Sequence, residues 1–301
     1  MLRTRVLTAL ILGPVVLAVA WFREPWLSVG ILLVAAVALW EAGDLLTAAG
    51  WPVPRVATVV AGLVLALAVL APLHADVVPA VADATEQLGG FGLPLAAAAL
   101  AVVALAMVAL RNQDPRIGFS AWMGSVFAVA YLGTLVPLIA VVGHLAPDGG
   151  TPDSPLGQLG WASGTGWLLL MFGLVWSCDS GAYFIGRAIG RRKLHALVSP
   201  GKTVEGYVGG AVTAGLVTAL LGWLLLDMSP LIGGVVGLVT AAIAQFGDLA
   251  KSMLKRVADR KDSGNLFPGH GGMLDRIDSL LFAAPVLLAG ALLLGGMHLA
   301  Q

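Results

Sequence analysis

The stretch GDLAKSMLKRVADRKDSGNLFPGHGGMLDRIDS, residues 247–279, separates two long apolar runs near the end of the chain. It holds eleven of the 34 charged side chains of the chain (17 acidic and 17 basic), and its part GNLFPGHGG contains four glycines. A membrane protein with so few charges therefore has about a third of them in this short stretch. We therefore expect the chemistry of the protein in this stretch.

The composition is that of a membrane protein. Of 301 residues, 58% are hydrophobic and 11% are charged, whereas soluble domains average about 25% charged residues. We therefore predict an all-α, polytopic integral membrane protein, with membrane lipids and no nucleic acid among its partners. The single cysteine, Cys178, excludes an internal disulfide and a cysteine-rich metal site, so we expect it to pack within a helix.

Apolar runs predict about nine membrane spans, because a bilayer core of about 30 Å needs roughly 20 apolar residues per helix. The first run follows MLRTR, and Ala18-Val19-Ala20 resembles a signal-peptide cleavage site. We expect this run to remain as a span, since the rest of the chain inserts well by itself. The predicted spans are residues 6–22, 27–46, 56–73, 92–110, 117–143, 161–186, 206–226, 230–249 and 279–299.

The basic residues give these spans an orientation. With a cytoplasmic N-terminus, sixteen of the seventeen Lys and Arg residues lie on the inner side, and only Arg23 lies outside. The long outer loops, 74–91 and 144–160, contain acidic residues but no Lys or Arg. We predict a multi-pass protein of the cell membrane. Residues 1–160 would form scaffold helices with candidate dimer contacts, and residues 161–301 a catalytic region facing the cytoplasm.

The predicted spans contain four carboxylates, Glu41, Asp44, Asp179 and Asp248, and these need polar surroundings because an ionised group is costly there. Asp179 lies eight residues before Arg187, which is about 12 Å along a regular helix. We expect it to face a wet pocket or a cation, or to be protonated and hydrogen-bonded to a neighbouring helix. Glu41 and Asp44 lie one helical turn apart near the inner end of the second span, where they either line a polar cavity or reach the interface.

The segment SPGKTVEGYVGG, residues 199–210, places Ser199, Lys202, Thr203 and Glu205 around a Pro-Gly turn and the start of a helix. Backbone amides at a helix start, together with lysine and threonine, favour an anion such as phosphate. The alternative is a helix N-cap beside a basic cytoplasmic loop. The spacing excludes a Walker loop. Glycine pairs at 186/190, 206/210 and 233/237 predict close helix packing instead of ligand binding.

The opening stretch also predicts a metal site. If the helix continues past Asp248, then one face of it carries Asp248, Ser252, Lys255 and Asp259. Asp248 would lie near the C-terminal end of its span, where the helix dipole disfavours a carboxylate, so we expect a cation beside it. Asp275 and Asp278 lie one turn apart at the start of the last span, where capping is the ordinary role.

Carboxylates from two helix ends, with no cysteine nearby, suit Mg²⁺ or Mn²⁺, and a second cation remains open. The flanking lysine and arginine side chains suit phosphate oxygens. Together these groups predict phosphoryl or nucleotidyl transfer, in which cations neutralise the charge of an in-line transition state.

Residues 252–278, SMLKRVADRKDSGNLFPGHGGMLDRID, resemble the signature of the phosphatidate cytidylyltransferases, also called CDP-diacylglycerol synthases. CDSGAYFIGRAIGRRKL (178–194) and SPGKTVEG (199–206) are similar to two further motifs of that family. The resemblance thus covers about 176–279. The signature elements present are Ser252, Lys255-Arg256, Lys261-Asp262, Gly264, Pro268, His270-Gly271-Gly272, Asp275-Arg276 and Asp278.

The resemblance implies a homodimeric enzyme that joins CTP and phosphatidate into CDP-diacylglycerol and releases pyrophosphate. It implies that Asp248 and Asp275 hold Mg²⁺ against the CTP phosphates. Lys255 and Arg256 would neutralise phosphate charge, and Asp278 would support the metal site or orient Arg276. The candidates for substrate binding are Asp179, Ser199, Lys202, Thr203, Glu205, Ser252, Lys261, Asp262, His270, Gly271, Gly272 and Arg276.

Three other classes are alternatives. A CTP-dependent polyprenol or dolichol kinase would move the γ-phosphate to a lipid alcohol and would need a general base. A CDP-alcohol phosphotransferase requires a DGxxAR beginning and DxxxD spacing, whereas this chain has DSGAYF and DRID. An ion-coupled transporter could use the acidic residues of the spans, but it would leave the cytoplasmic Lys, Arg and glycine cluster without a role, and no inverted repeat is visible.

Overall fold

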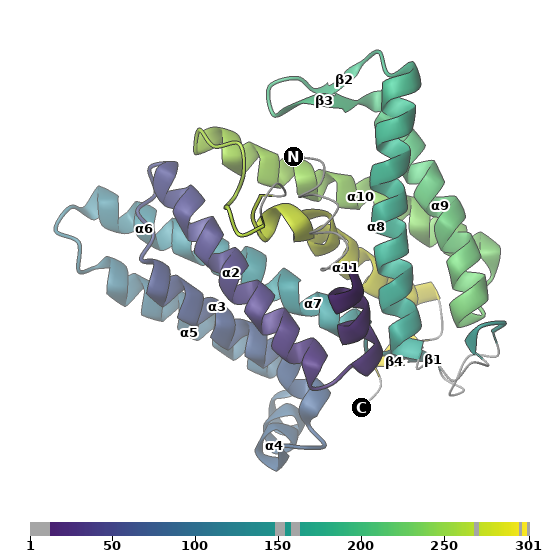
Figure 1. Ribbon diagram of the computed structural model, residues 1–301. Helices are drawn as coiled ribbons and strands as arrows, with labels where there is room; N and C mark the ends of the chain where they lie inside the picture. Colours follow the sequence, from purple (N-terminus) through teal and green to yellow (C-terminus); the bar gives the residue numbers. More distant parts are fainter. Residues whose placement is uncertain (1–12, 148–153, 158–162, 268–270, 295–296, 300–301) are drawn as a thin grey trace. The chain divides into compact units, whose positions relative to one another are not determined.

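The computed structural model describes residues 13–147, 154–157, 163–267, 271–294 and 297–299, and these are mainly helical (Figure 1). A helix over Gly13–Phe22 precedes the labelled elements. The longer helices are α2 (Trp26–Ala48), α3 (Arg55–Leu70), α5 (Gly92–Ala109), α6 (Pro115–Ala128), α8 (Ser163–Ile189), α9 (Val204–Leu226), α10 (Pro230–Val257) and α11 (Leu274–Leu294). The shorter elements are η1 (Ala71–His74), α4 (Pro79–Leu88), η2 (Val129–Gly133), α7 (Thr134–Val142), β1 (Leu145–Pro147), β2 (Lys193–His195), β3 (Ser199–Thr203) and β4 (Met297–Leu299).

Eight helical segments of the described chain are long and apolar enough to cross a bilayer. They correspond to the second through ninth predicted spans, which confirms the all-α, polytopic membrane fold. The first predicted span, 6–22, lies partly outside the described residues, and its described part is the apolar helix Gly13–Phe22. The count of nine and the cytoplasmic N-terminus therefore stay predictions.

Two helix boundaries at the opening stretch differ from the predicted spans. Helix α10 continues to Val257, beyond the predicted end at 249, and α11 begins at Leu274, before the predicted start at 279. Hydropathy marks the part of a helix that fits the bilayer, whereas Ala, Lys, Met, Leu and Arg in 250–256 are all good helix formers outside it. The chain leaves the helical conformation at Asp259, whose φ is 50°.

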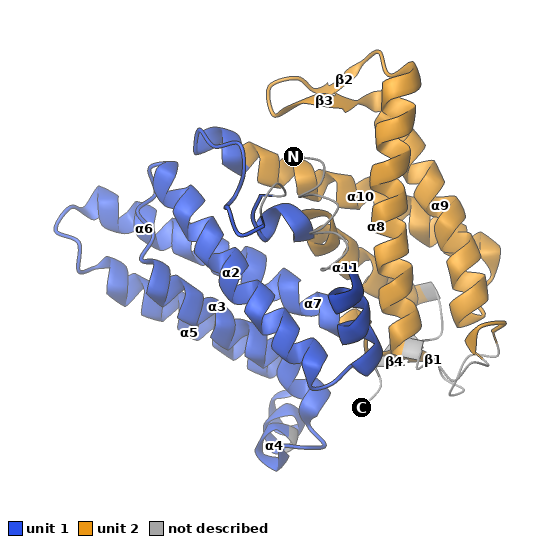
Figure 2. Ribbon diagram, in the orientation of Figure 1, with its two compact units in different colours: residues 1–140, 254–277, 301 blue, residues 141–253, 278–300 orange. Residues whose placement is uncertain are grey.

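The chain forms two compact units (Figure 2). The boundaries between the units fall within helices α7, α10 and α11. Unit 1 comprises residues 1–140, 254–277 and 301, and unit 2 comprises 141–253 and 278–300. Unit 1 therefore combines the N-terminal helices with the segment that joins α10 to α11, residues 258–273, which we call the connection. The expected functional division at residue 160 stays a prediction.

Within unit 1, α3 packs against α2, α5, α6 and η2. A small apolar core joins these helices, and it consists of Leu65, Ala97, Ala101, Leu105 and Val129. The element η2 is a π-helical turn between α6 and α7. At its end Gly133 approaches the backbone of α3 so closely that a Cβ there would lie 2.9 Å from the Gly62 carbonyl oxygen. Small residues thus set the packing of this unit.

Within unit 2, α8 and α9 form the most extensive helix pair. A Cβ at Gly206 would lie 2.7 Å from the Ala182 carbonyl oxygen, and one at Gly210 would lie 2.7 Å from the Cys178 carbonyl oxygen. At Gly237 a Cβ would lie 2.4 Å from the Thr218 Cβ of α9. The predicted packing role of these glycines is confirmed. The core of α8 to α11 is correspondingly built from small residues and includes the buried Cys178, as expected.

Two short sheets also belong to unit 2. Strand β1 pairs antiparallel with β4, and β2 pairs antiparallel with β3, with Lys193 opposite Thr203. The β2–β3 hairpin extends from the end of α8 and leads directly into α9 (Figure 1). The segment 199–203, expected as a loop, is therefore a strand, and its pairing with β2 holds Lys202 and Thr203 in an extended backbone.

Candidate functional site

Two carboxylates of unit 2 share one buried lysine. The Lys251 Nζ atom lies 3.0 Å from Asp248 Oδ1 and also contacts Asp278 Oδ2. The Lys202 Nζ atom, from the hairpin, lies 2.7 Å from Asp248 Oδ2. Gly247 makes this approach of α10 and α11 possible, because a Cβ there would lie 2.4 Å from the Asp278 carbonyl oxygen. Two acids and two lysines thus form a neutral cluster.

The expectation of a cation beside Asp248 was based on the helix dipole, and the structure shows that this reason is wrong. Helix α10 continues past Asp248 to Val257, so the carboxylate is not at the C-terminal end of the helix dipole. A cation does lie beside it, but it is the ammonium of a lysine on each carboxylate oxygen. The requirement for neutralisation comes from partial burial, since only 29% of the Asp248 side chain is exposed.

The segment after β3 begins α9 with a side-chain cap. Thr203 Oγ1 accepts a hydrogen bond from Gly206 N at 3.1 Å, which satisfies one of the free amides of the first turn. Glu205 accepts hydrogen bonds from the backbone N–H groups of Arg191 and Arg192 and so fixes the hairpin to the helix. The N-cap interpretation of this segment is confirmed. Its role in phosphate binding stays a prediction.

In unit 1, Asp275 is held by the connection. Its Oδ2 atom accepts hydrogen bonds from Ser263 N at 2.8 Å and Gly272 N at 3.2 Å, and it lies 3.0 Å from Ser263 Oγ. Its Oδ1 atom accepts from Lys255 Nζ at 2.7 Å. Only 6% of the Asp275 side chain is exposed. Gly271 has a φ of 80°, a conformation that favours glycine, and it directs the connection back toward Asp275.

The two acids of α2 have different surroundings. Glu41 is buried and accepts hydrogen bonds from Ser263 Oγ, Met273 N and Leu274 N. Asp44 is 44% exposed and forms an ion pair of 2.6 Å with Arg55. The interpretation of a polar environment thus holds for Glu41, whose surroundings are hydrogen-bond donors of the connection. Asp44 has the surface position that was the alternative.

The remaining predicted residues are placed as follows. Exposed side chains are those of Asp179 on α8, Arg256 at the end of α10, Lys261 and Asp262 in the connection, and Arg276 on α11. Ser199 and Ser252 are half-buried, and His270 lies outside the described residues. Asp248 belongs to unit 2 and Asp275 to unit 1. That they share one metal ion therefore stays a prediction.

Sequence reasoning missed two residues of these clusters. Lys251 is 5% exposed, although lysine is almost never buried without a partner. Its position three residues after Asp248 on a helix was a usable signal, because such residues are neighbours. Ser263, which is 6% exposed, carries no signal in a single sequence, since serine is common in glycine-rich turns.

Comparison with known proteins places the chain in a family. The sequence pattern described as the cytidylyltransferase family matches residues 3–293. This chain belongs to the cytidylyltransferase family. The match includes the N-terminal helices, where sequence inspection finds no diagnostic motif.

Curated members of the family show the same relationship over part of their length. The chain is 45% identical over 159 residues to the phosphatidate cytidylyltransferase of Haemophilus influenzae, which is 50% of this chain and 52% of the relative. Identity is 50% over 116 residues to the enzyme of that name from Bacillus subtilis, covering 38% of this chain and 43% of the relative. It is 40% over 148 residues to that of Synechocystis, covering 48% and 49%. The chain thus spans about half the length of the curated relatives it matches.

The donor atoms of this family member fit Mg²⁺ better than a softer metal. Among the described residues, no three His, Cys, Asp or Glu side chains gather closely enough to hold a metal ion by themselves. Mg²⁺ is commonly held by one or two carboxylates, with phosphate oxygens and water completing its shell. Asp248 and Asp278 have the right oxygen chemistry, but lysines neutralise them. A metal ion here would therefore need further ligands and would compete with the lysine ammonium groups for these carboxylates.

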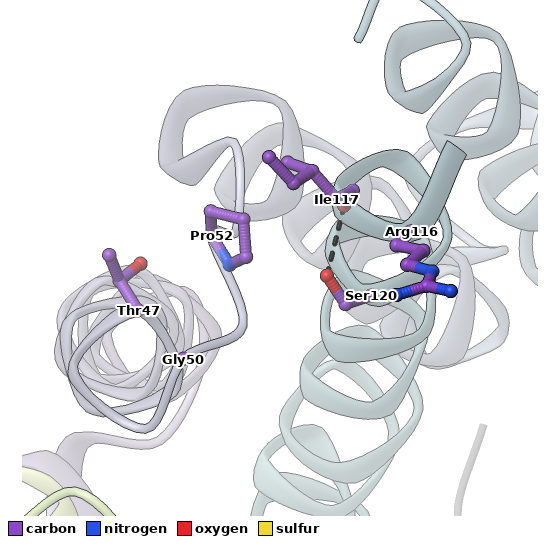
Figure 3. A pocket seen from close by; sticks show the side chains of 6 residues that line it. All are labelled: Thr47, Gly50, Pro52, Arg116, Ile117 and Ser120. Carbon is purple, nitrogen blue, oxygen red and sulfur yellow. Dashed lines mark hydrogen bonds between the residues drawn. The ribbon is translucent and has the colours of Figure 1, made fainter. Parts of the chain in front are cut away.

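A pocket elsewhere in unit 1 contains none of the predicted residues. It is lined by Thr47, Gly50, Pro52, Arg116, Ile117 and Ser120 (Figure 3). The hydrogen bond drawn there, from Ser120 Oγ to the Ile117 carbonyl oxygen at 3.0 Å, lies within α6. The lining offers one cationic side chain, that of Arg116, and no carboxylate. This pocket therefore lacks the groups for nucleotidyl transfer.

A second polar cluster of unit 1 has the composition of a nucleophile with a base and an acid. Ser28 Oγ lies 3.0 Å from Glu24 Oε1 and 3.0 Å from His74 Nε2. Glu24 Oε2 approaches that same Nε2 atom at 3.7 Å. In a hydrolytic triad the acid instead holds the second ring nitrogen, so that the first can accept the serine proton. The geometry does not fit a triad.

Proposed function

We propose that the protein is a phosphatidate cytidylyltransferase, which converts CTP and phosphatidate into CDP-diacylglycerol and pyrophosphate. The observation that carries the proposal is the family match over residues 3–293, together with identities of 40–50% to relatives of that name. The clusters of carboxylates and lysines around residues 248–278 support it, because they provide the charges that a nucleotide triphosphate requires.

In the proposed reaction, a phosphate oxygen of phosphatidate attacks the α-phosphorus of CTP. The bond from that phosphorus to the oxygen bridging the α- and β-phosphates breaks, and pyrophosphate leaves with the electron pair. The attacking oxygen is already anionic near neutral pH, so the chain needs no strong base. Lys255 and Arg256 would neutralise the negative charge of the transition state.

Mg²⁺ on the CTP phosphates would supply further charge neutralisation, and Asp248 and Asp275 would hold it, with Mn²⁺ and a second cation as variants of this site. Lys202 binds Asp248 at 2.7 Å and is 28% exposed, so its ammonium can transfer to an incoming phosphate. Asp278 would keep Lys251 in place. The exposed Lys261 and Arg276 would attract the two anionic substrates.

The orientation and assembly are part of the proposal. CTP is a cytoplasmic metabolite, and the positive-inside rule places the basic connection on the cytoplasmic side of the membrane. The proposed assembly is a homodimer, as the resemblance implies. A cysteine scan of Lys261 and Arg111, labelled from either side of sealed vesicles, tests the orientation. Labelling of both residues from the outside of right-side-out vesicles would contradict it.

The decisive experiment separates the transferase from the kinase alternative. Purified protein is incubated with Mg²⁺, a lipid acceptor and CTP labelled either at the α- or at the γ-phosphate. With phosphatidate as acceptor, we expect the α-label in lipid and the γ-label in pyrophosphate. Transfer of the γ-label to a polyprenol, with no α-label in lipid, would establish the kinase instead. Ion flux in liposomes without any lipid product would establish a transporter.

A further inference from the structure

Glu41 of α2 is a buried carboxylate bound to a segment more than 200 positions away in the sequence. It is 6% exposed, and a carboxylate in such a place is costly unless donors surround it. Its Oε1 atom accepts from Met273 N at 2.9 Å. Its Oε2 atom accepts from Leu274 N at 3.0 Å and from Ser263 Oγ at 2.9 Å. Both carboxylate oxygens are therefore engaged by the connection and by the start of α11.

Two of these donors belong to the beginning of α11. The helix begins at Leu274, and its first amides have no partner within the helix. A negative charge at a helix N-terminus satisfies such amides and interacts favourably with the helix dipole. Glu41 thus caps α11 from a different helix, and this contact fixes where α11 begins.

The Glu41 carboxylate occupies the space that a side chain would need at two glycines of the connection. A Cβ at Gly264 would lie 2.4 Å from Glu41 Oε1. A Cβ at Gly272 would lie 2.3 Å from Glu41 Oε2 and 2.3 Å from Ser263 Oγ. Each distance is too short for a real contact, so any larger residue would displace the carboxylate. The glycine pattern of the signature therefore matches the volume of the Glu41 side chain.

Ser263 links Glu41 to Asp275. Its hydroxyl lies 2.9 Å from Glu41 Oε2 and 3.0 Å from Asp275 Oδ2, and its backbone N–H donates to Asp275 Oδ2 at 2.8 Å. A hydroxyl has one proton and can donate to one carboxylate at a time. The two acids therefore compete for one donor, and the remaining backbone donors keep each of them fixed.

We propose that Glu41 is a positioning residue of the site. It holds the connection through Ser263, Met273 and Leu274, and it thereby orients Asp275. The inference deepens the proposed function, because the importance of the Asp275 orientation for catalysis depends on that function. It assigns a role in the site to an N-terminal helix that the sequence identifies only as scaffold.

The test compares Glu41→Gln with Asp44→Asn in purified full-length protein. Both changes replace a carboxylate with its amide on the same helix, but Asp44 is 44% exposed and pairs with Arg55. Glutamine keeps the volume, but its NH₂ group would face a backbone N–H or the serine hydroxyl. Hydrogen exchange of the Met273 and Leu274 amides should become at least about tenfold faster in Glu41→Gln, the loss expected for a hydrogen bond to a charged group, and should not change in Asp44→Asn.

Activity gives the second measurement. Turnover by Glu41→Gln should fall about 10- to 100-fold, the range for residues that orient a ligand, and half-maximal rate should require more Mg²⁺. Glu41→Asp keeps the charge, so its turnover and its Mg²⁺ requirement should lie between those of Glu41→Gln and the wild type. Ser263→Ala should act through the same contact, so its effect and that of Glu41→Gln should not add in the double variant.

Two outcomes would overturn the inference: unchanged exchange at Met273 and Leu274 in Glu41→Gln, or a loss of turnover no larger than that of Asp44→Asn. If Glu41→Gln does not fold, Ser263→Ala carries the test, because it leaves the two backbone donors of Glu41 in place. The exchange measurement needs no substrate. A wild-type protein that labels no lipid would therefore refute the proposed function and leave this result intact.

Discussion

Asp275 and Asp248 are both predicted metal ligands, but the structure holds them by different means. Backbone N–H groups of Ser263 and Gly272 donate to Asp275, in addition to the Lys255 ammonium, and the Asp275 side chain is 6% exposed. Lysine side chains contact Asp248, whose side chain is 29% exposed. Backbone donors cannot leave unless the connection changes shape, whereas the Lys202 side chain, which is 28% exposed, can change its rotamer. Asp275 is thus preorganised, whereas a metal ion or another cation could replace the Lys202 ammonium beside Asp248.

The largest expected effect is the loss of activity in Asp275→Asn and Asp248→Asn. Each change removes a charge that the proposed metal site requires, so turnover should fall by more than about a hundredfold, the upper range for residues that only orient a ligand. Transfer of α-labelled CTP into lipid measures this. Turnover near the wild-type level in either variant would remove that aspartate from the proposed site.

Thermal unfolding of the same two variants sharpens the comparison. In Asp275→Asn, an amide NH₂ replaces an oxygen among N–H donors and leaves buried groups unpaired, so the free energy of unfolding should fall by about 1–3 kcal/mol. In Asp248→Asn, Lys202 can reach water and Lys251 keeps Asp278, so the fall should be smaller. An equal fall in the free energy of unfolding of the two variants would show that backbone donors and lysine side chains stabilise these carboxylates equally.

Lys251→Met tests the lysine cluster directly. Removal of the buried ammonium leaves Asp248 and Asp278 without their shared cation, which should lower the free energy of unfolding by about 3–5 kcal/mol. The double variant Lys251→Met/Asp278→Leu removes the uncompensated charge of Asp278 and should recover much of this loss. Thermal unfolding in detergent measures both.

A divalent ion provides the second measurement on Lys251→Met. In the wild type, two lysines neutralise Asp248 and Asp278, so Mg²⁺ without nucleotide should not raise the unfolding temperature. In Lys251→Met, Lys202 still pairs with Asp248, so the two carboxylates keep one excess negative charge, and Mg²⁺ alone should raise the unfolding temperature. A strong shift of the wild type by Mg²⁺ alone would show that the lysines do not compete with the metal.

The sequence predicted the helical membrane fold because apolar length alone determines which segments can span a bilayer. It also identifies the aspartates as candidate site residues, because charges between apolar runs are few and each one needs a reason. It did not predict where α10 ends, because a helix can continue into water without any change in hydropathy. Lysine ammonium groups lie beside Asp248, whereas the metal ion stays a prediction, and the argument from the helix dipole was wrong because α10 continues to Val257.

Most of the hydrogen-bond partners of these carboxylates could not be predicted from the sequence. Glu41 and Ser263 lie in contact although α2 and the connection are far apart in the chain, and one sequence carries no record of such a pair. The fit of Gly264 and Gly272 around Glu41 likewise appears only in three dimensions. Lys251 could have been found, since a lysine within an apolar helix must have an anionic partner.

The smallest expected changes in stability come from two lysine–aspartate ion pairs, Lys255–Asp275 and Lys202–Asp248. Lys255 and Lys202 each bind a carboxylate at 2.7 Å, but their side chains are 13% and 28% exposed. Lys255→Met should lower the free energy of unfolding by about 1–3 kcal/mol, as for a hydrogen bond to a charged group. Lys202→Met should lower it by no more than about 1 kcal/mol, because solvent screens the pair.

Added salt separates these two pairs further. At 1 M salt the Debye length falls to about 3 Å, so the small contribution of Lys202 should vanish, whereas that of the more buried Lys255 should largely remain. If Lys202 transfers to phosphate, Lys202→Met should also raise the KM for CTP although the protein stays as stable as the wild type. A stable Lys202→Met variant with an unchanged KM would leave Lys202 with no role beyond its contact with Asp248.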